Sequence, residues 1–399
     1  MKELLNGTIS SPLGFKSNAM HCGIKRKRPD VALIYSIVKA QAAGVFTANK
    51  VKAAPVIVDM QQLRGNTAQA IVVNSGNANC CTGKRGERDA WKVVEAAARC
   101  LDVSKADVLV ASTGVIGKFL PKEAIIKALP ELSAGLGFDK AQETAGAIMT
   151  TDKFSKQTAV EFEIKGKRVT VGAVAKGAGM ICPDMATMLC FVTTDACISA
   201  KALKKALASA VDESFNCISV DGEMSTNDSV IILANGLAAN ELIKQGTPEW
   251  NNFTAALQYV CLKLAKMIVE DGEGATKIIQ VMVEGAGTKK EACQAAARIA
   301  NSLLVKTMIA GENPNWGRIS ACVGASGARF AENKLEIFLQ KKVVYKNAMP
   351  ALKTSETLIR LLKEKNINIT VKLHNGTYSH TIWASDLTAE YVKINTEYN

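Results

Sequence analysis

The chain alternates short apolar runs with stretches in which apolar residues recur at helical spacing, and this alternation predicts a mixed α/β protein. Apolar runs bounded by turn residues predict strands at 31–37, 55–59, 70–73, 108–112, 187–192 and 277–283. Helical spacing predicts helices at 89–101, 199–211, 251–270, 290–305 and 355–365. Further strands are expected from residue 335 onward. The sequence contains no internal repeat and no low-complexity linker.

Length and composition agree with this fold class. A chain of 399 residues suits two domains, or one large α/β unit with a second lobe. Aromatic residues make up 5% of the chain and hydrophobic residues 48%, so the core must consist mainly of Ala, Val, Ile and Leu. Such a core favours α/β packing.

The net charge of +12 raises the question of nucleic-acid binding, because basic surfaces attract phosphate backbones. The basic residues, however, form short clusters such as Lys25 to Arg28, without the interleaved aromatic residues that stack on bases. We interpret these clusters as solvated faces that also attract anionic substrates. Nucleic acid is therefore not an expected partner.

Cysteine and histidine usage narrows the chemistry further. The eleven cysteines include no C-x-x-C pair, and three histidines supply neither a zinc site nor a histidine-based triad convincingly. The first residues contain no apolar targeting core, and no later run approaches the length of a membrane span. We therefore expect a cytoplasmic protein with no membrane partner and no metal.

The segment KGAGMICPDMATML, residues 176–189, carries the strongest chemical signal. It places Thr187 behind Ala186, after a glycine-rich turn and before an apolar run. A threonine hydroxyl is a weak nucleophile unless a base takes its proton, and a freed α-amine on the same residue can be that base because its pKa lies near 8. One hypothesis is an acyl-transfer enzyme activated by cleavage at Ala186–Thr187. The alternative is that Thr187 simply begins a buried strand.

Residues 176–195 also resemble the cleavage-site region of the ornithine acetyltransferases, or glutamate N-acetyltransferases, of arginine biosynthesis. The similarity covers nearly the whole chain. It includes the runs AGVFTAN from Ala43, VNSGNAN from Val73, STGVIG from Ser112, MTTD from Met149, VDGEMSTND from Val220 and GENPNWGR from Gly311. This resemblance implies an α/β fold of layered sheets and helices, of the N-terminal-nucleophile-like type, with a second lobe in the C-terminal half. It also implies self-cleavage into an alpha chain, 1–186, and a beta chain, 187–399.

The family assigns roles that carry over to matching positions of this sequence. They imply that Thr187 is the nucleophile and that Thr113 and Gly114 form the oxyanion hole. They also imply substrate binding by Thr150, Lys176, Thr187, Glu273 and Asn395, with Asn399 in place of a last polar contact of the family. Taken alone, these positions are equally typical of turns, of a helix cap and of a solvated lysine.

The activity implied by the resemblance is a two-step exchange. N2-acetylornithine acetylates Thr187 and releases ornithine, and glutamate then takes the acetyl group. The resemblance also implies that no cofactor is bound and that two alpha and two beta chains form a heterotetramer. Acetyl-CoA is a further co-substrate in some family members. An amidohydrolase of the N-terminal-nucleophile kind remains the alternative. A nucleotide-binding protein is less well supported, because residues 274–277 lack the Gly-Lys-Ser/Thr ending of a phosphate loop.

Overall fold

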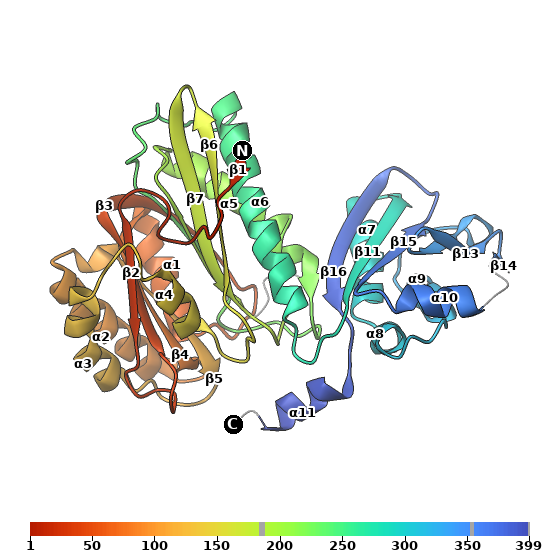
Figure 1. Ribbon diagram of the computed structural model, residues 1–399, viewed down its shortest axis with the longest axis horizontal. Coiled ribbons are helices and arrows are strands. Elements are labelled where there is room, and N and C mark those ends of the chain that lie inside the picture. Colours follow the sequence, from red (N-terminus) through yellow and green to blue (C-terminus); the bar gives the residue numbers. More distant parts are fainter. Residues whose placement is uncertain (183–187, 352–354, 398–399) are drawn as a thin grey trace. The chain divides into compact units, whose positions relative to one another are not determined.

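The computed structural model describes residues 1–182, 188–351 and 355–397, and it has a mixed α/β fold (Figure 1). Two compact units are present. Unit 1 comprises residues 1–177, 184–216 and 224–268, and unit 2 comprises residues 178–183, 217–223 and 269–399. The prediction of an α/β fold with layered sheets and helices and a second lobe in the C-terminal half is confirmed.

Unit 1 contains most of the long strands. Its strands are β1 (Lys2–Glu3), β2 (Phe15–Met20), β3 (Val31–Phe46), β4 (Thr67–Asn77), β5 (Val108–Val115), β6 (Lys156–Ile164), β7 (Lys167–Lys176), β8 (Leu189–Thr194) and β10 (Ser229–Ala234). Its helices are α1 (Ala54–Gln62), α2 (Gly83–Leu101), α3 (Lys122–Ala134), α4 (Ala141–Ile148) and α5 (Ala200–Asp212), with α6 (Pro248–Glu270) running on into unit 2.

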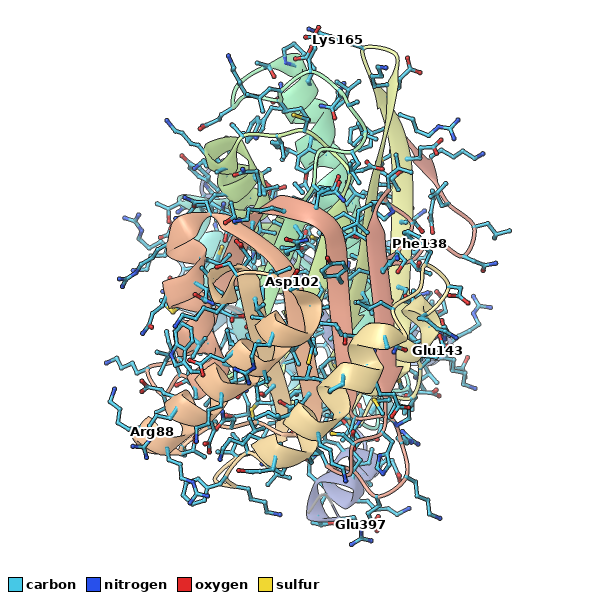
Figure 2. All side chains as sticks on the ribbon, turned by 90° about the vertical axis from the view of Figure 1, so that its left-hand side faces the viewer. Arg88, Asp102, Phe138, Glu143, Lys165 and Glu397 are labelled. Atoms are coloured by element: carbon cyan, nitrogen blue, oxygen red, sulfur yellow. The ribbon has the colours of Figure 1, made fainter. Side chains whose placement is uncertain are left out.

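Within the described residues these strands form one sheet in the order β1-β6-β7-β8-β10-β3-β4-β5, with β2 paired to β3. Helices α1, α2 and α3 share an apolar cluster with one face of β3, β4 and β5. The other face of these strands packs with β7, β8, β10 and α4. In Figure 2, Lys165 at the turn between β6 and β7 and Arg88 on α2 mark opposite ends of the unit. The apolar strand runs of the sequence are therefore the inner layers of this unit.

The predicted strand at 55–59 is wrong, because this run belongs to helix α1. Pro55 occupies the first turn of the helix, where its missing N–H costs no hydrogen bond. Short apolar runs cannot be assigned to strand or helix by periodicity alone. The buried Asp59 then fixes α1 to the sheet, because its Oδ1 accepts the backbone N–H of Val110 on β5 at 2.9 Å.

Unit 2 has its own sheet and helices. Its strands are β9 (Ile218–Ser219), β11 (Ile278–Ala286), β12 (Glu336–Leu339), β13 (Lys342–Lys346), β14 (Met349–Pro350), β15 (Asn366–Lys372) and β16 (Tyr378–Ser385). Its helices are α7 (Lys289–Ala300), α8 (Leu303–Ala310), α9 (Gly317–Gly324), α10 (Ser355–Leu362) and α11 (Ala389–Glu397). The described strands pair in the order β14-β13-β12-β15-β11-β16-β9.

The predicted helix at 290–305 is divided in the structure. Helix α7 ends at Ala300, and Ser302 caps α8 by accepting the backbone N–H of Val305 at 3.3 Å. The two helices and α9 then enclose the apolar core of unit 2 with β11, β15 and β16. Among the described helices, none combines the length and the apolar composition needed to cross a membrane.

Candidate active site

The pairing of β7, β8 and β10 sets the geometry of the site in unit 1. Lys176 at the end of β7 pairs with Leu189, the first residue of β8, and Leu189 pairs with Ser229, the first residue of the parallel strand β10. The residues just before β8 and β10 therefore lie at the sheet edge where β7 ends. Ala186 and Thr187, the predicted cleavage site and nucleophile, lie outside the described residues.

Thr113 and Gly114 occupy the end of β5 and face this edge. The Lys176 Nζ donates a hydrogen bond to the Thr113 Oγ1 at 3.2 Å, and both side chains are 3% exposed. Gly114 has a φ of 133°, and a Cβ there would lie 2.3 Å from the carbonyl carbon of Gly76. The position therefore requires glycine. The structure brings together Thr113, Gly114 and Lys176, three of the residues predicted from the sequence.

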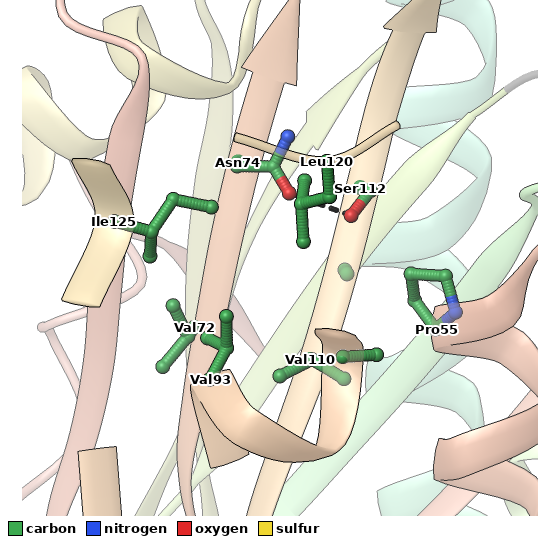
Figure 3. Close-up of a pocket in the computed structure, with 10 residues that line it drawn as sticks. Pro55, Val72, Asn74, Val93, Val110, Ser112, Leu120 and Ile125 are labelled. Carbon is green, nitrogen blue, oxygen red and sulfur yellow. Dashed lines mark hydrogen bonds between the residues drawn. The ribbon is translucent and has the colours of Figure 1, made fainter. Parts of the chain in front are cut away.

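A small cavity lies behind β5 and has largely apolar walls (Figure 3). The Ser112 Oγ donates a hydrogen bond of 2.6 Å to the Asn74 Oδ1 at one side of this cavity. Since Ser112 directly precedes Thr113, this bond ties the strand end that carries Thr113 to β4. The wall of the cavity therefore includes the hydrogen bond that holds the strand end with the candidate oxyanion hole.

Asp152 connects the Thr150 segment to Lys176. Its carboxylate accepts the backbone N–H of Thr150 at 2.9 Å, the backbone N–H of Gly177 at 2.7 Å and the Lys156 Nζ at 2.7 Å. Burial alone would raise the pKa of Asp152, but the charges of Lys176 and Lys156 and these hydrogen bonds hold it well below its usual range. An ionised carboxylate therefore places Thr150 beside the end of β7.

Lys25 is a site neighbour that the sequence interpretation missed. Its Nζ donates to the carbonyl oxygens of Pro29 at 3.1 Å, Ala147 at 3.1 Å and Met149 at 2.6 Å. Burial lowers the pKa of Lys25 to about 8, and the positive charge of Lys176 acts in the same direction. The interpretation of the 25–28 cluster as a solvated face is therefore wrong for this residue. Nothing in the local pattern distinguishes Lys25 from its basic neighbours.

Two consecutive residues before β10, Asn227 and Asp228, also reach the site, and sequence reasoning assigned no role to them. The Asn227 Nδ2 donates to the carbonyl oxygens of Ser112 and Ala78, each at 2.7 Å. The Asp228 Oδ1 accepts the backbone N–H of Met188 at 3.0 Å. Their signal in the sequence is the polar STND run immediately before an apolar strand.

The remaining predicted residues belong to unit 2. The Asn395 Nδ2 on α11 donates to the Glu273 Oε2 at 2.8 Å. A Cβ on Gly179 would lie 2.4 Å from the Glu273 carboxyl carbon, so glycine lets this carboxylate approach the backbone. Asp221 orients the same segment by accepting the backbone N–H of Met180 at 2.6 Å. Asn399 lies outside the described residues.

Among the residues that the structure describes, no group of three or more His, Cys, Asp or Glu side chains is placed to hold a metal ion. The charged groups at the end of β7 are instead paired with one another or with backbone groups. This arrangement suits chemistry in which fixed donors stabilise negative charge.

Comparisons with known proteins agree on one family. The model of the ArgJ family matches residues 16–399. The arginine biosynthesis bifunctional protein ArgJ of Caldanaerobacter subterraneus is 48% identical over 402 residues, covering 99% of each chain. The protein of the same name from Bacillus subtilis is 43% identical over 398 residues, covering 99% of this chain and 97% of its own. A crystal structure of the ArgJ protein from Bacillus halodurans matches with 44% sequence identity and a TM-score of 0.50. The match covers 52% of this chain and 98% of that chain.

Proposed function

The chain belongs to the ArgJ family, and on this premise we propose that it moves an acetyl group from N2-acetylornithine to glutamate through an acetyl ester on Thr187. It is an acetyltransferase of arginine biosynthesis, a glutamate N-acetyltransferase. The structural observation that carries the proposal is the buried contact between Lys176 and Thr113, beside the turn at Gly114. This contact lies at the sheet edge that also receives the start of β8.

The chemistry follows from the donors at this edge. The Thr187 hydroxyl attacks the acetyl carbonyl carbon while its α-amine accepts the proton, and the carbonyl oxygen becomes an oxyanion. Thr113 accepts a hydrogen bond from Lys176, so its own hydroxyl hydrogen is directed elsewhere and stabilises the oxyanion together with the Gly114 N–H. Collapse breaks the C–N bond, and ornithine leaves with the proton. The amine of glutamate then attacks the ester and restores the Thr187 hydroxyl.

Substrate recognition requires a cation for the carboxylate and an anion for the ammonium group of an amino acid. We propose that Glu273, held by Asn395, supplies the anion and that Lys176 and Thr150 contact the carboxylate end. Asn399 is proposed as a further polar contact. These assignments rest on the family motif positions and on the charges of the side chains.

Cleavage between Ala186 and Thr187 is the proposed source of the reactive amine. The comparison with the Bacillus halodurans structure supports this, because the match takes in 98% of that chain but only 52% of this chain. A fragment that begins at Thr187 would have about this length. Mass spectrometry of the denatured protein tests the proposal: two fragments separated at Thr187 are expected, and an intact single chain would exclude the mechanism.

The transfer itself is tested by incubating the purified protein with N2-acetylornithine and glutamate. We expect ornithine and N-acetylglutamate in equal amounts, and an acetylated beta chain when glutamate is omitted. Thr187→Ala should abolish both cleavage and transfer, whereas Thr187→Ser keeps a hydroxyl and should retain part of each. Release of free acetate without N-acetylglutamate would favour the amidohydrolase alternative instead.

Three further proposals concern the context of the reaction. We propose that acetyl-CoA is a second acetyl donor, which isotope-labelled acetyl-CoA and glutamate would test. We also propose that two alpha and two beta chains form a heterotetramer, which light scattering of the cleaved protein would test. The proposed location is the cytoplasm, as expected for a biosynthetic enzyme that uses free amino acids, and cell fractionation would test it.

A further inference from the structure

Asn227 and Asp228 connect two strands that the proposed reaction must hold in register. Asn227 binds the carbonyl oxygen of Ser112, the residue before Thr113. Asp228 binds the backbone N–H of Met188, the residue after Thr187. Because these are adjacent residues of one chain, the two strand ends are tied to a two-residue bridge at the start of β10.

The bridge is held by its own surroundings. The Asp228 carbonyl oxygen accepts the backbone N–H of Thr47 at 3.1 Å, and the Ser229 N–H donates to the Met188 carbonyl oxygen at 3.3 Å. The Thr226 Oγ1 donates to the Asn227 Oδ1 at 2.7 Å, which leaves the amide nitrogen of Asn227 directed at β5. Both bridge residues are buried, Asp228 fully. Because both residues are buried and hydrogen-bonded, the bridge can fix the distance between the strand ends that it joins.

We propose that Asp228 is a positioning residue for the acetyl-transfer reaction, holding the backbone next to Thr187 at a fixed distance from the oxyanion donors while Asn227 holds the backbone next to Thr113. This inference rests on the proposed function. It adds a role for two residues that touch neither the acetyl group nor the substrate. Their effect is on the separation of nucleophile and oxyanion hole, to which reaction rates are very sensitive.

The charge of Asp228 matters as well as its geometry. Its Oδ2 is buried. Burial raises the pKa of Asp228 to about 8, against the hydrogen bonds from the Met188 N–H and the Ser225 side chain and the positive charge of Lys176. Below this pH the carboxyl is mostly uncharged, so it does not oppose the negative charge that forms at the oxyanion. As pH rises through 8, ionisation places a negative charge beside Lys176 and should slow the transfer.

Two substitutions at Asp228 separate the effect of its charge from the effect of its hydrogen bond. Asp228→Asn keeps an oxygen that accepts the Met188 N–H and cannot ionise, so transfer at pH 7 should stay within about threefold of wild type, and the decline above pH 8 should be lost. Asp228→Ala removes the acceptor and should lower kcat about 100-fold with little change in KM. Mass spectrometry measures cleavage in each variant, and kcat is expressed per mole of cleaved, folded protein.

Asp195 is a matched control, because it is a buried carboxylate at the other end of β8. Its oxygens accept the backbone N–H groups of Leu13 at 3.0 Å and Thr170 at 2.8 Å, so Asp195, like Asp228, is a buried carboxylate that binds backbone N–H groups. Asp195→Ala should lower thermal stability but leave kcat per folded molecule within about twofold. A purely structural role for Asp228 predicts the same behaviour for both alanine variants.

The outcomes distinguish the inference from the function on which it rests. If wild-type protein neither cleaves nor transfers acetyl, the proposed function fails. If wild type transfers acetyl and Asp228→Asn keeps the full decline above pH 8, with kcat of Asp228→Ala matching that of Asp195→Ala, the positioning role is overturned. If Asp228→Ala does not accumulate as a folded, cleaved protein, the pH profile of Asp228→Asn alone decides.

Discussion

The two units hold their candidate site residues in different ways. In unit 1, Thr113, Lys176 and Asp152 are buried, and each is hydrogen-bonded to another side chain or to the backbone. In unit 2, Glu273 is buried but its partner Asn395 lies on α11, a helix without buried residues. Groups that stabilise a short-lived charge must be fixed before the reaction, whereas groups that recognise a substrate can adjust. We therefore expect changes to Thr113 and Gly114 in unit 1 to lower kcat and changes to Glu273 in unit 2 to raise KM.

Among the substitutions that test this comparison, the largest effect is expected from Gly114→Ala. The added Cβ would lie 2.3 Å from the carbonyl carbon of Gly76 and 2.5 Å from the nitrogen of Asn77, so the backbone itself must move. Both proposed oxyanion donors then shift, and kcat should fall more than about 1,000-fold. Steady-state kinetics on folded protein measures this. Gly146→Ala on α4 is the control, because nothing lies near its added Cβ; equal losses in both variants would contradict the argument.

Thr113→Ala should have the next largest effect. It removes the hydroxyl that accepts from Lys176 and, as proposed, donates to the oxyanion, and the loss of one such donor lowers kcat by about 100-fold. The KM for N2-acetylornithine should change little. Thr113→Ser keeps the hydroxyl and should recover most of the rate. An increase in KM at constant kcat would instead assign Thr113 to substrate binding.

Glu273→Gln tests the other side of the comparison. The substitution keeps the shape of the side chain but removes the charge proposed to bind the substrate ammonium group, so KM should rise about tenfold while kcat changes less. Gly179→Ala should act similarly, because its Cβ would displace the Glu273 carboxylate and not backbone. Glu270→Gln is the control, since Glu270 pairs with Lys365 at the surface. A fall in kcat at constant KM would place Glu273 with the unit 1 residues.

Much of the fold follows from apolar periodicity, and its failures have identifiable causes. The strand regions 31–37, 70–73 and 108–112 lie within β3, β4 and β5. The run at 55–59 is compatible with a strand because neither its length nor its β-branched residues exclude one, and only the hydrogen bond between Asp59 and β5 shows how α1 is fixed to the sheet. The division between α7 and α8 depends on Ser302, a cap that a continuous apolar pattern conceals.

The candidate site was less accessible to local patterns. Thr113, Gly114 and Lys176 come from strands that are far apart in the sequence and not adjacent in the sheet, and the hydrogen bond from Lys176 to Thr113 is what places them together. Resemblance to a family selected these positions, whereas their local patterns were equally typical of turns. Lys25 and Asp228 escaped because their roles depend on burial and on backbone groups from other segments, which composition does not encode.

The smallest expected effect concerns the support of the unit 1 residues by Lys25. Lys25→Met leaves the Met149 carbonyl oxygen without its Lys25 donor, which should lower the free energy of unfolding by about 1–3 kcal/mol at pH 7. Because the pKa of Lys25 is about 8 when folded and 10.5 in its ordinary state, the unfolded chain binds more protons between these values. The contribution of Lys25 to stability therefore rises with pH across this interval.

Denaturant unfolding at pH 7 and pH 9.5 measures this contribution, with Lys27→Met as the control because Lys27 is an exposed neighbour in the same basic cluster. The difference in unfolding free energy between wild type and Lys25→Met should increase at the higher pH, and that for Lys27→Met should stay within about 0.5 kcal/mol at both. If the two variants change the free energy of unfolding equally, the interpretation of Lys25 as a solvated residue is correct. If only Lys25→Met lowers the free energy of unfolding, Lys25 is held in the folded protein as the other unit 1 site residues are, although its neighbours in the basic cluster face solvent.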